Sequence, residues 1–112
     1  MNKNIFIDNI WTIIVDRPMG SEHPTMGFMY PVNYGYVMDT KLPDGQELEA
    51  YVLGVFEPVD EFTGKCIALV QRSDDSFARL VIVPEDVNYT EEQIGALIEF
   101  QEQFFSSMII RG

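Results

Sequence analysis

The sequence centres on two neighbouring segments, YPVNYGYV at residues 30–37 and DGQELEA at residues 44–50. The first segment is rich in aromatic and β-branched residues, which favour a strand, expected over residues 30–39. Pro31 must lie at the start or on the edge of that strand, because proline has no N–H to donate to a neighbouring strand. Leu-Pro-Asp-Gly at residues 42–45 is a strong turn signal, and residues 48–56 have the composition of a second strand. The two segments therefore predict two strands joined by an acidic turn.

Three further segments have the composition of strands, at residues 5–15, 65–72 and 78–83. Turns are expected at residues 62–64 (Phe-Thr-Gly) and 73–76 (Ser-Asp-Asp-Ser). Residues 17–27 contain several prolines and glycines without any periodicity and predict an irregular loop. Loops of this length in a small domain are often functional.

The C-terminal part of the chain changes to helical spacing. Thr90 followed by Gln93 has the pattern of a capping box, and Ile94, Leu97 and Ile98 repeat with the period of a helix. One amphipathic helix is expected over residues 90–107, packed on the sheet. The fold class is therefore mainly β with one C-terminal helix, a small OB-like and partly open β-barrel. Residues 1–112 are expected to form a single domain.

The composition limits the classes of protein to consider. The chain is 46% hydrophobic and 12% aromatic, which is enough to bury a core. No apolar run approaches the roughly 20 residues that a membrane-spanning helix needs. The first residues lack the features of a signal peptide, and the single Cys66 cannot form an internal disulfide. These features predict a cytoplasmic protein.

The charge is strongly acidic, with seven Lys and Arg against eighteen Asp and Glu and a net charge of −11. Such a chain repels nucleic-acid phosphates and anionic membranes, so neither is expected as a partner. An acidic surface commonly serves solubility alone. The alternative is that part of the charge forms a metal site, in which case a phosphate-bearing substrate arrives together with its metal.

Acidic side chains stand at several predicted strand ends and turns: Asp16, Asp44, Glu49, Asp74 and Asp75. In a barrel, acids from different strand ends can converge on one ion, and Mg²⁺ prefers carboxylate oxygens, water and substrate phosphates as ligands. Bound metals can lower the pKa of a water and so supply a hydroxide nucleophile. Tyr34 can donate a hydrogen bond to a phosphate oxygen. On residue types alone, solvated turn acids explain the same pattern.

Four segments resemble, in register, the soluble inorganic pyrophosphatases of family I. They are VDRPMGS at residues 15–21, YPVNYGY at residues 30–36, DGQELE at residues 44–49, and Asp75 followed by RLVIVP at residues 79–84. Residues 100–105 also resemble the helix that closes the active site of that family. The resemblance runs over most of the chain, and the two middle segments are its most specific part.

The resemblance implies Mg²⁺-dependent hydrolysis of inorganic pyrophosphate to two phosphates, with Mn²⁺ or Co²⁺ as other possible metals. The metal ligands that it implies are Asp16, Asp44, Glu49 and Asp75. The residues that it places on the small phosphoanhydride substrate are Tyr34, Arg79, Arg17 and His23. Asp44 and Tyr34 are the residues that it implies for the catalytic step itself.

The chain also departs from the family pattern. The second acid of the signature is Gln46 here, and the third is Glu49 in place of aspartate. After Asp75, a further acid is absent and the expected lysine is Arg79. A Tyr-Lys pair in the closing helix is replaced by two phenylalanines at residues 104–105, and a basic hairpin is missing. The second hypothesis is therefore a non-catalytic pyrophosphatase-like module that binds a ligand or a partner.

Three further features of the sequence allow a structural or a functional explanation. His23 lies in the Pro/Gly-rich loop, where an exposed loop histidine is the alternative to a ligand-binding one. Cys66 sits in an apolar run and is expected to be buried and inert. The C-terminal segment is unusually apolar, and part of it is expected to pair subunits in a homo-oligomer; its residues are Phe100, Phe104, Phe105, Met108, Ile109 and Ile110.

Overall fold

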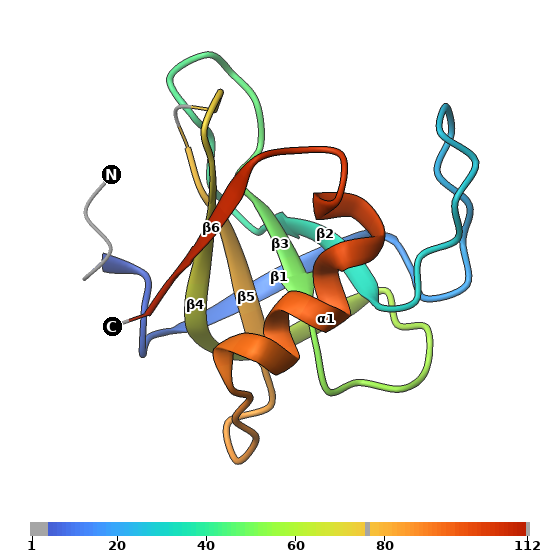
Figure 1. Cartoon of the computed structure of the whole chain (residues 1–112). Helices are drawn as coiled ribbons and strands as arrows, with labels where there is room; N and C mark the ends of the chain where they lie inside the picture. The colour runs from blue at the N-terminus through green and yellow to red at the C-terminus, as the bar shows by residue number, and fades with distance from the viewer. Residues whose placement is uncertain (1–4, 76, 112) are drawn as a thin grey trace.

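The computed structural model describes residues 5–75 and 77–111. Its elements are β1 (Ile10–Arg17), β2 (Asn33–Val37), β3 (Glu49–Val52), β4 (Glu61–Arg72), β5 (Arg79–Val83), α1 (Glu91–Glu102) and β6 (Ser107–Ile110). The strand order is β1-β2-β3-β5-β4-β6, and β1 also pairs with β4. This additional pairing closes the first five strands into a barrel, with β6 attached outside it on β4 (Figure 1). The predicted OB-like β-barrel with one helix is thus confirmed, and its barrel is closed rather than partly open.

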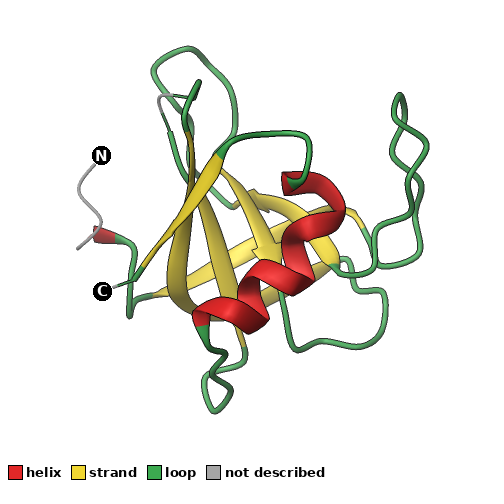
Figure 2. Cartoon of the chain, viewed as in Figure 1, coloured by secondary structure: helices red, strands yellow, loops and turns green. Residues whose placement is uncertain are grey.

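The barrel is antiparallel except at one junction, where β3 and β5 run parallel. The long strand β4 makes three pairings, with β1 through its first residues and with β5 and β6 further along. Helix α1 lies across one side of the barrel (Figure 2). Within the described residues, no helix combines the length and the apolar character required to pass through a membrane.

The core has two layers, because side chains of a strand alternate between its faces. On β5, Leu80 and Ile82 belong to the cluster inside the barrel, whereas Val81 and Val83 belong to the cluster between the barrel and α1. Ile94 on α1 is fully buried in this outer cluster. The strands under the helix are therefore apolar on both faces, which explains their nearly continuous hydrophobic sequence. Cys66 is buried in the inner cluster as expected, and burial raises the pKa of its thiol to about 11.

The turn expected at residues 62–64 is wrong, because these residues lie inside β4. Gly64 pairs with Trp11 of β1, and a Cβ placed on it would lie 2.4 Å from the carbonyl oxygen of Val83. This glycine therefore serves the close approach of two backbones where the barrel closes, and not a turn.

The helix expected to reach residue 107 ends at Glu102, and residues 107–110 form β6. Val70 pairs with Ile109 and Leu69 with Ile110, which places these two isoleucines partly in the outer and inner clusters, respectively. Part of the apolar segment is thus core, whereas Phe104, Phe105 and Met108 remain exposed.

The loop between β1 and β2 projects from the barrel as a long arm (Figure 1). Glu22 and Met29 form an isolated antiparallel bridge across it, and Met19 N–H donates to Asn33 Oδ1 at its base. The C-terminal end of α1 lies beside the arm, since the rings of Phe28 and Phe100 are 5.6 Å apart. The arm and the end of the helix are therefore in contact beside the barrel.

Candidate ligand-binding cleft

A cleft of about 210 Å³ lies between the β1–β2 arm, the barrel and the C-terminal end of α1. It contains three of the seven Lys and Arg residues of this acidic chain, Arg17, Arg72 and Arg79. Other residues that line it are Asp16, His23, Tyr30, Tyr34, Glu49, Gln101 and Phe105. Six of the residues singled out from the sequence therefore meet in one place, and Asp44 and Asp75 are outside this lining.

A β-bulge brings two neighbouring residues of β1 to the same cleft. Val15 pairs with Gly35 and Arg17 with Tyr34, so Asp16 is an extra residue in the strand. In a regular strand Asp16 and Arg17 would point to opposite faces. The bulge re-aims them, and both line the cleft. Asp16 is exposed, yet loss of water around its carboxyl raises its pKa, and the nearby Arg17 partly offsets this shift.

Arg79 is the central cation of the site. Its Nη2 donates to Glu49 Oε1 at 2.9 Å, its Nη1 to Asp75 Oδ2 at 3.0 Å, and its Nε to the Tyr34 hydroxyl at 3.1 Å. Glu49 and Arg79 are neighbours because they begin β3 and β5, which run parallel. Burial opposes the charged form of Arg79, but these three contacts raise its pKa above the ordinary value.

The four predicted metal ligands do not all meet in one place, since Asp16 and Glu49 line the cleft and Asp44 and Asp75 are outside its lining. Asp44 lies in an exposed loop, where its Oδ1 accepts a hydrogen bond from the Gln46 N–H at 3.0 Å. Glu49 and Asp75 instead share the guanidinium of Arg79. Across residues 5–75 and 77–111, no three His, Cys, Asp or Glu side chains are grouped so that they could hold a metal ion. Among the described residues the acids therefore form no preassembled cluster of three metal ligands.

A buried polar network anchors the floor of the cleft to α1. Arg72 donates two parallel hydrogen bonds to Glu102, from Nε to Oε1 at 3.0 Å and from Nη2 to Oε2 at 2.7 Å. The Tyr51 hydroxyl also donates to Glu102, and Gln101 Nε2 donates to the Tyr51 oxygen at 2.8 Å. Burial alone would raise the pKa of Glu102, but the bonds from Arg72 and Tyr51 outweigh it and lower that pKa.

A second chain of hydrogen bonds starts from the arm. Arg17 Nη1 donates to the Tyr30 hydroxyl at 3.3 Å, and this hydroxyl donates to Gln101 Oε1 at 2.9 Å. His23 is held by its own loop, because its Nδ1 accepts the N–H groups of Thr25 and Met26. In the neutral ring the proton is therefore on Nε2, which is left as a donor at the cleft.

Several of these residues were not foreseen from the sequence. Arg72 was the last residue of an expected strand, and Gln101 and Glu102 were two polar positions in an expected helix. Only the pairing of β4 with the helix end brings them together. The sequence does contain a signal for Glu102. It follows Ile94 and Ile98 at four-residue spacing, so it lies on the buried face of the helix, where a charged side chain requires a partner.

We expect acid to destabilise the protein through Glu102. Its folded-state pKa is depressed, so its contribution to stability is present above the unfolded value of about 4.3 and is lost as the pH falls below it. Asp75, paired with Arg79, acts in the same direction, and Asp16 acts in the opposite one because its pKa is raised. Urea denaturation between pH 7 and pH 3 should show the midpoint falling steeply below about pH 4.5. A constant midpoint down to pH 3 would contradict the pairing of Glu102.

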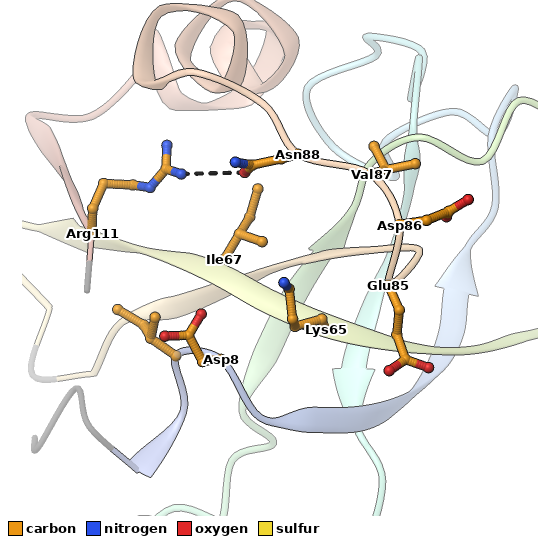
Figure 3. A pocket seen from close by; sticks show the side chains of 9 residues that line it. Asp8, Lys65, Ile67, Glu85, Asp86, Val87, Asn88 and Arg111 are labelled. Carbon is orange, nitrogen blue, oxygen red and sulfur yellow. Dashed lines mark hydrogen bonds between the residues drawn. The ribbon is translucent and has the colours of Figure 1, made fainter.

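A larger cavity of about 410 Å³ lies at the other end of α1, near the segment that precedes the helix (Figure 3). Lys65 from β4 lies there between Asp8 and Glu85, and Arg111 donates to Asn88 Oδ1 at 3.4 Å. None of the site residues predicted from the sequence lines this cavity. Its lining contains two cations, Lys65 and Arg111, against three carboxylates, Asp8, Glu85 and Asp86, so it offers less positive charge to an anion than the first cleft does.

Comparison with known proteins gives structural matches only. No protein-family model and no curated protein matches the sequence. Among solved structures, an inorganic pyrophosphatase from Ehrlichia chaffeensis aligns with a TM-score of 0.67 and 15% identity, over 90% of this chain and 84% of that one. An inorganic pyrophosphatase from Coxiella burnetii aligns with a TM-score of 0.59 and 18% identity, over 93% and 84% of the two chains.

A third structure, an inorganic pyrophosphatase from Neisseria gonorrhoeae, aligns with a TM-score of 0.58 and 18% identity, over 88% of this chain and 79% of that one. The alignments span nearly the whole of the chain, so they include the barrel and the helix together. At identities this low, similarity establishes the architecture and not the chemistry. The chain has the fold of these inorganic pyrophosphatases.

Proposed function

We propose that the cleft binds inorganic pyrophosphate or a related phosphoanhydride through its arginines, without a resident metal cluster. The observation that carries this proposal is the gathering of Arg17, Arg72 and Arg79 in one cleft of a chain whose net charge is −11. Guanidinium groups match phosphate oxygens in geometry and charge. The shared fold of inorganic pyrophosphatases supports the same ligand class.

The arginines keep donors for a ligand although each already has partners. A guanidinium carries five N–H donors. The hydrogen bonds among the described residues use three of them on Arg79, two on Arg72 and one on Arg17. The bonds that are made fix the planes of the groups. Arg17 and Arg79 keep N–H donors for phosphate oxygens, whereas the more buried Arg72 contributes its charge. Such pre-orientation lowers the entropic cost of binding.

Asp16 and Glu49 in the same cleft oppose a highly charged anion. A pyrophosphate with a bound divalent cation carries less negative charge than the free ion, so its repulsion by these carboxylates is smaller. We therefore expect pyrophosphate to bind more tightly in millimolar Mg²⁺ than in its absence. The metal in this proposal belongs to the ligand.

The experiment is a titration of the purified protein with pyrophosphate, followed by calorimetry. Replacing Arg17 with methionine should weaken binding by about tenfold or more, because a charge-assisted hydrogen bond contributes on the order of 1.5–3 kcal/mol. Replacing Lys41 with methionine is the matched control, since Lys41 is an exposed cation outside the cleft. Absence of any pyrophosphate binding, with or without Mg²⁺, would refute the proposal.

Hydrolysis of the bound anhydride is the second candidate, and Asp16 is the observation that favours it. Among the described residues Asp16 is a cleft carboxylate outside the ion pairs, which is a suitable state for accepting a proton from an attacking water. Phosphate release in Mg²⁺, Mn²⁺ or Co²⁺ should then be lost in Asp16→Asn. It should survive in Asp44→Asn, because Asp44 lies outside the cleft. The reverse result would restore Asp44 as the functional acid.

A further inference from the structure

Two exposed phenylalanines follow the C-terminal end of α1, and one of them lines the cleft. Phe104 is 50% exposed and Phe105 is 38% exposed, and only Gln103 separates them from the end of α1 at Glu102. Phe105 lines the cleft itself. Exposed aromatic rings gathered beside a charged cleft require an explanation, because each leaves a large apolar surface in water.

The rings are fixed by their neighbours. The guanidinium of Arg72 lies 3.7 Å from the centroid of the Phe105 ring, and Arg72 is itself clamped by Glu102. The rings of Phe104 and Phe28 are stacked, with centroids 5.9 Å apart and an angle of 14° between their planes. Both rings are therefore presented in defined orientations, with little rotamer freedom left to lose when a ligand binds.

From this juxtaposition of phosphate donors and exposed rings, we infer that the ligand of the cleft is a nucleoside diphosphate or triphosphate. The inference rests on the proposed phosphoanhydride binding and extends it to the substrate class. The phosphates lie against Arg17 and Arg79, and the base stacks at the mouth on Phe105, with Phe104 next to it. A base has an aromatic face that such a ring can cover, whatever its hydrogen-bonding pattern.

The volume of the cleft agrees with phosphates bound inside it and a base bound at its rim. A cleft of about 210 Å³ is smaller than the roughly 300–1,000 Å³ that encloses a drug-sized ligand, so it holds the phosphates while the base remains at the rim. A bare pyrophosphate has no apolar surface and gains nothing from Phe104 and Phe105. The rim also contains Met26, which is 48% exposed and lines the cleft from the arm. A thioether beside an aromatic ring adapts readily to a planar ligand.

The test compares the affinities of ADP, pyrophosphate and adenosine, each measured by calorimetry in Mg²⁺. Wild-type protein should bind ADP about tenfold or more tightly than pyrophosphate, because stacking of one base contributes a factor of at least about this size. In Phe105→Leu the ratio of the ADP affinity to the pyrophosphate affinity should fall below about threefold, because the base loses the ring on which it stacks. Leucine keeps an apolar side chain at the position, and a thermal melt verifies that the variant is folded.

The matched control is Phe56→Leu, since Phe56 is 81% exposed and does not line the cleft. It should leave all three affinities unchanged. Pyrophosphate binding without any gain for ADP would overturn the inference and leave the proposed function standing, whereas absence of binding by both would overturn the two together. A third result, in which Phe104→Leu changes the sedimentation coefficient of the protein but not its ADP affinity, would assign the rings to contact between subunits and overturn the inference as well.

Discussion

Replacing Gly35 with alanine should unfold the protein or lower its free energy of unfolding by about 3 kcal/mol or more. Gly35 lies in β2 opposite Val15, and an added Cβ would stand 1.9 Å from the carbonyl oxygen of Ile14. That atom belongs to the backbone of β1, so it cannot move aside as a flexible side chain does. Relief requires β1 and β2 to separate next to the bulge at Asp16. Urea denaturation of the variant measures the loss.

The matched control is Gly95→Ala in α1. A Cβ at this position would meet nothing closer than Ile109 Cδ1 at 3.8 Å, which is an ordinary contact. Alanine is favoured over glycine inside a helix by about 1 kcal/mol, so this variant should be slightly more stable than the wild type. If Gly35→Ala were as stable as Gly95→Ala, the close approach of β1 and β2 would be incorrect.

Replacing Arg72 with methionine should cost about 3–5 kcal/mol, because it leaves the buried carboxylate of Glu102 without its cation. The side chains of Arg72 and Glu102 are only 8% and 5% exposed, so water cannot compensate for the loss. In the variant the depressed pKa of Glu102 should rise, because burial then acts without the opposing bonds. Its destabilisation should therefore diminish on acidification, in contrast to the wild type.

The double variant Arg72→Met with Glu102→Leu distinguishes a lost contact from an unpaired charge. Removing both ions should recover most of the stability, since replacing a buried pair with apolar residues is often neutral. In that variant Tyr51 still accepts a hydrogen bond from Gln101 Nε2, and the O–H of Tyr51 loses Glu102 as its acceptor. A double variant as unstable as the single one would show that Arg72 acts by packing against Phe105 and not by neutralising Glu102.

The sequence predicted well those elements whose signal is local. The start of α1 at Glu91 follows from the capping box of Thr90 and Gln93, both halves of which are formed in the structure. The apolar run before Arg72 is a strand, as a short and nearly continuous hydrophobic segment bounded by polar residues predicts. These features depend on residues that are close in the sequence, so they can be predicted without knowledge of the fold.

The features that decide the chemistry depend on residues far apart in the sequence. In the sequence Arg79 is simply a basic residue after a turn. Its position between Glu49 and Asp75 follows from the parallel pairing of β3 with β5. The bulge at Asp16 arises from the pairing of β1 with β2. Neither pairing register can be derived from local composition, so the sequence alone does not predict that Glu49 and Asp75 pair with Arg79.

The closure of the barrel has a consequence for how the chain folds. β1 pairs with β4, which brings Ile10 opposite Lys65, and β3 pairs with β5 although all of β4 lies between them in the sequence. Such long-range contacts form only after large loops have closed, which makes folding slow compared with a helical protein of the same size. Until β4 is in place, the strands before it have exposed edges that can pair with another chain. The period before closure is thus when the protein is most prone to aggregate, and chaperones that shield strand edges would act at that stage.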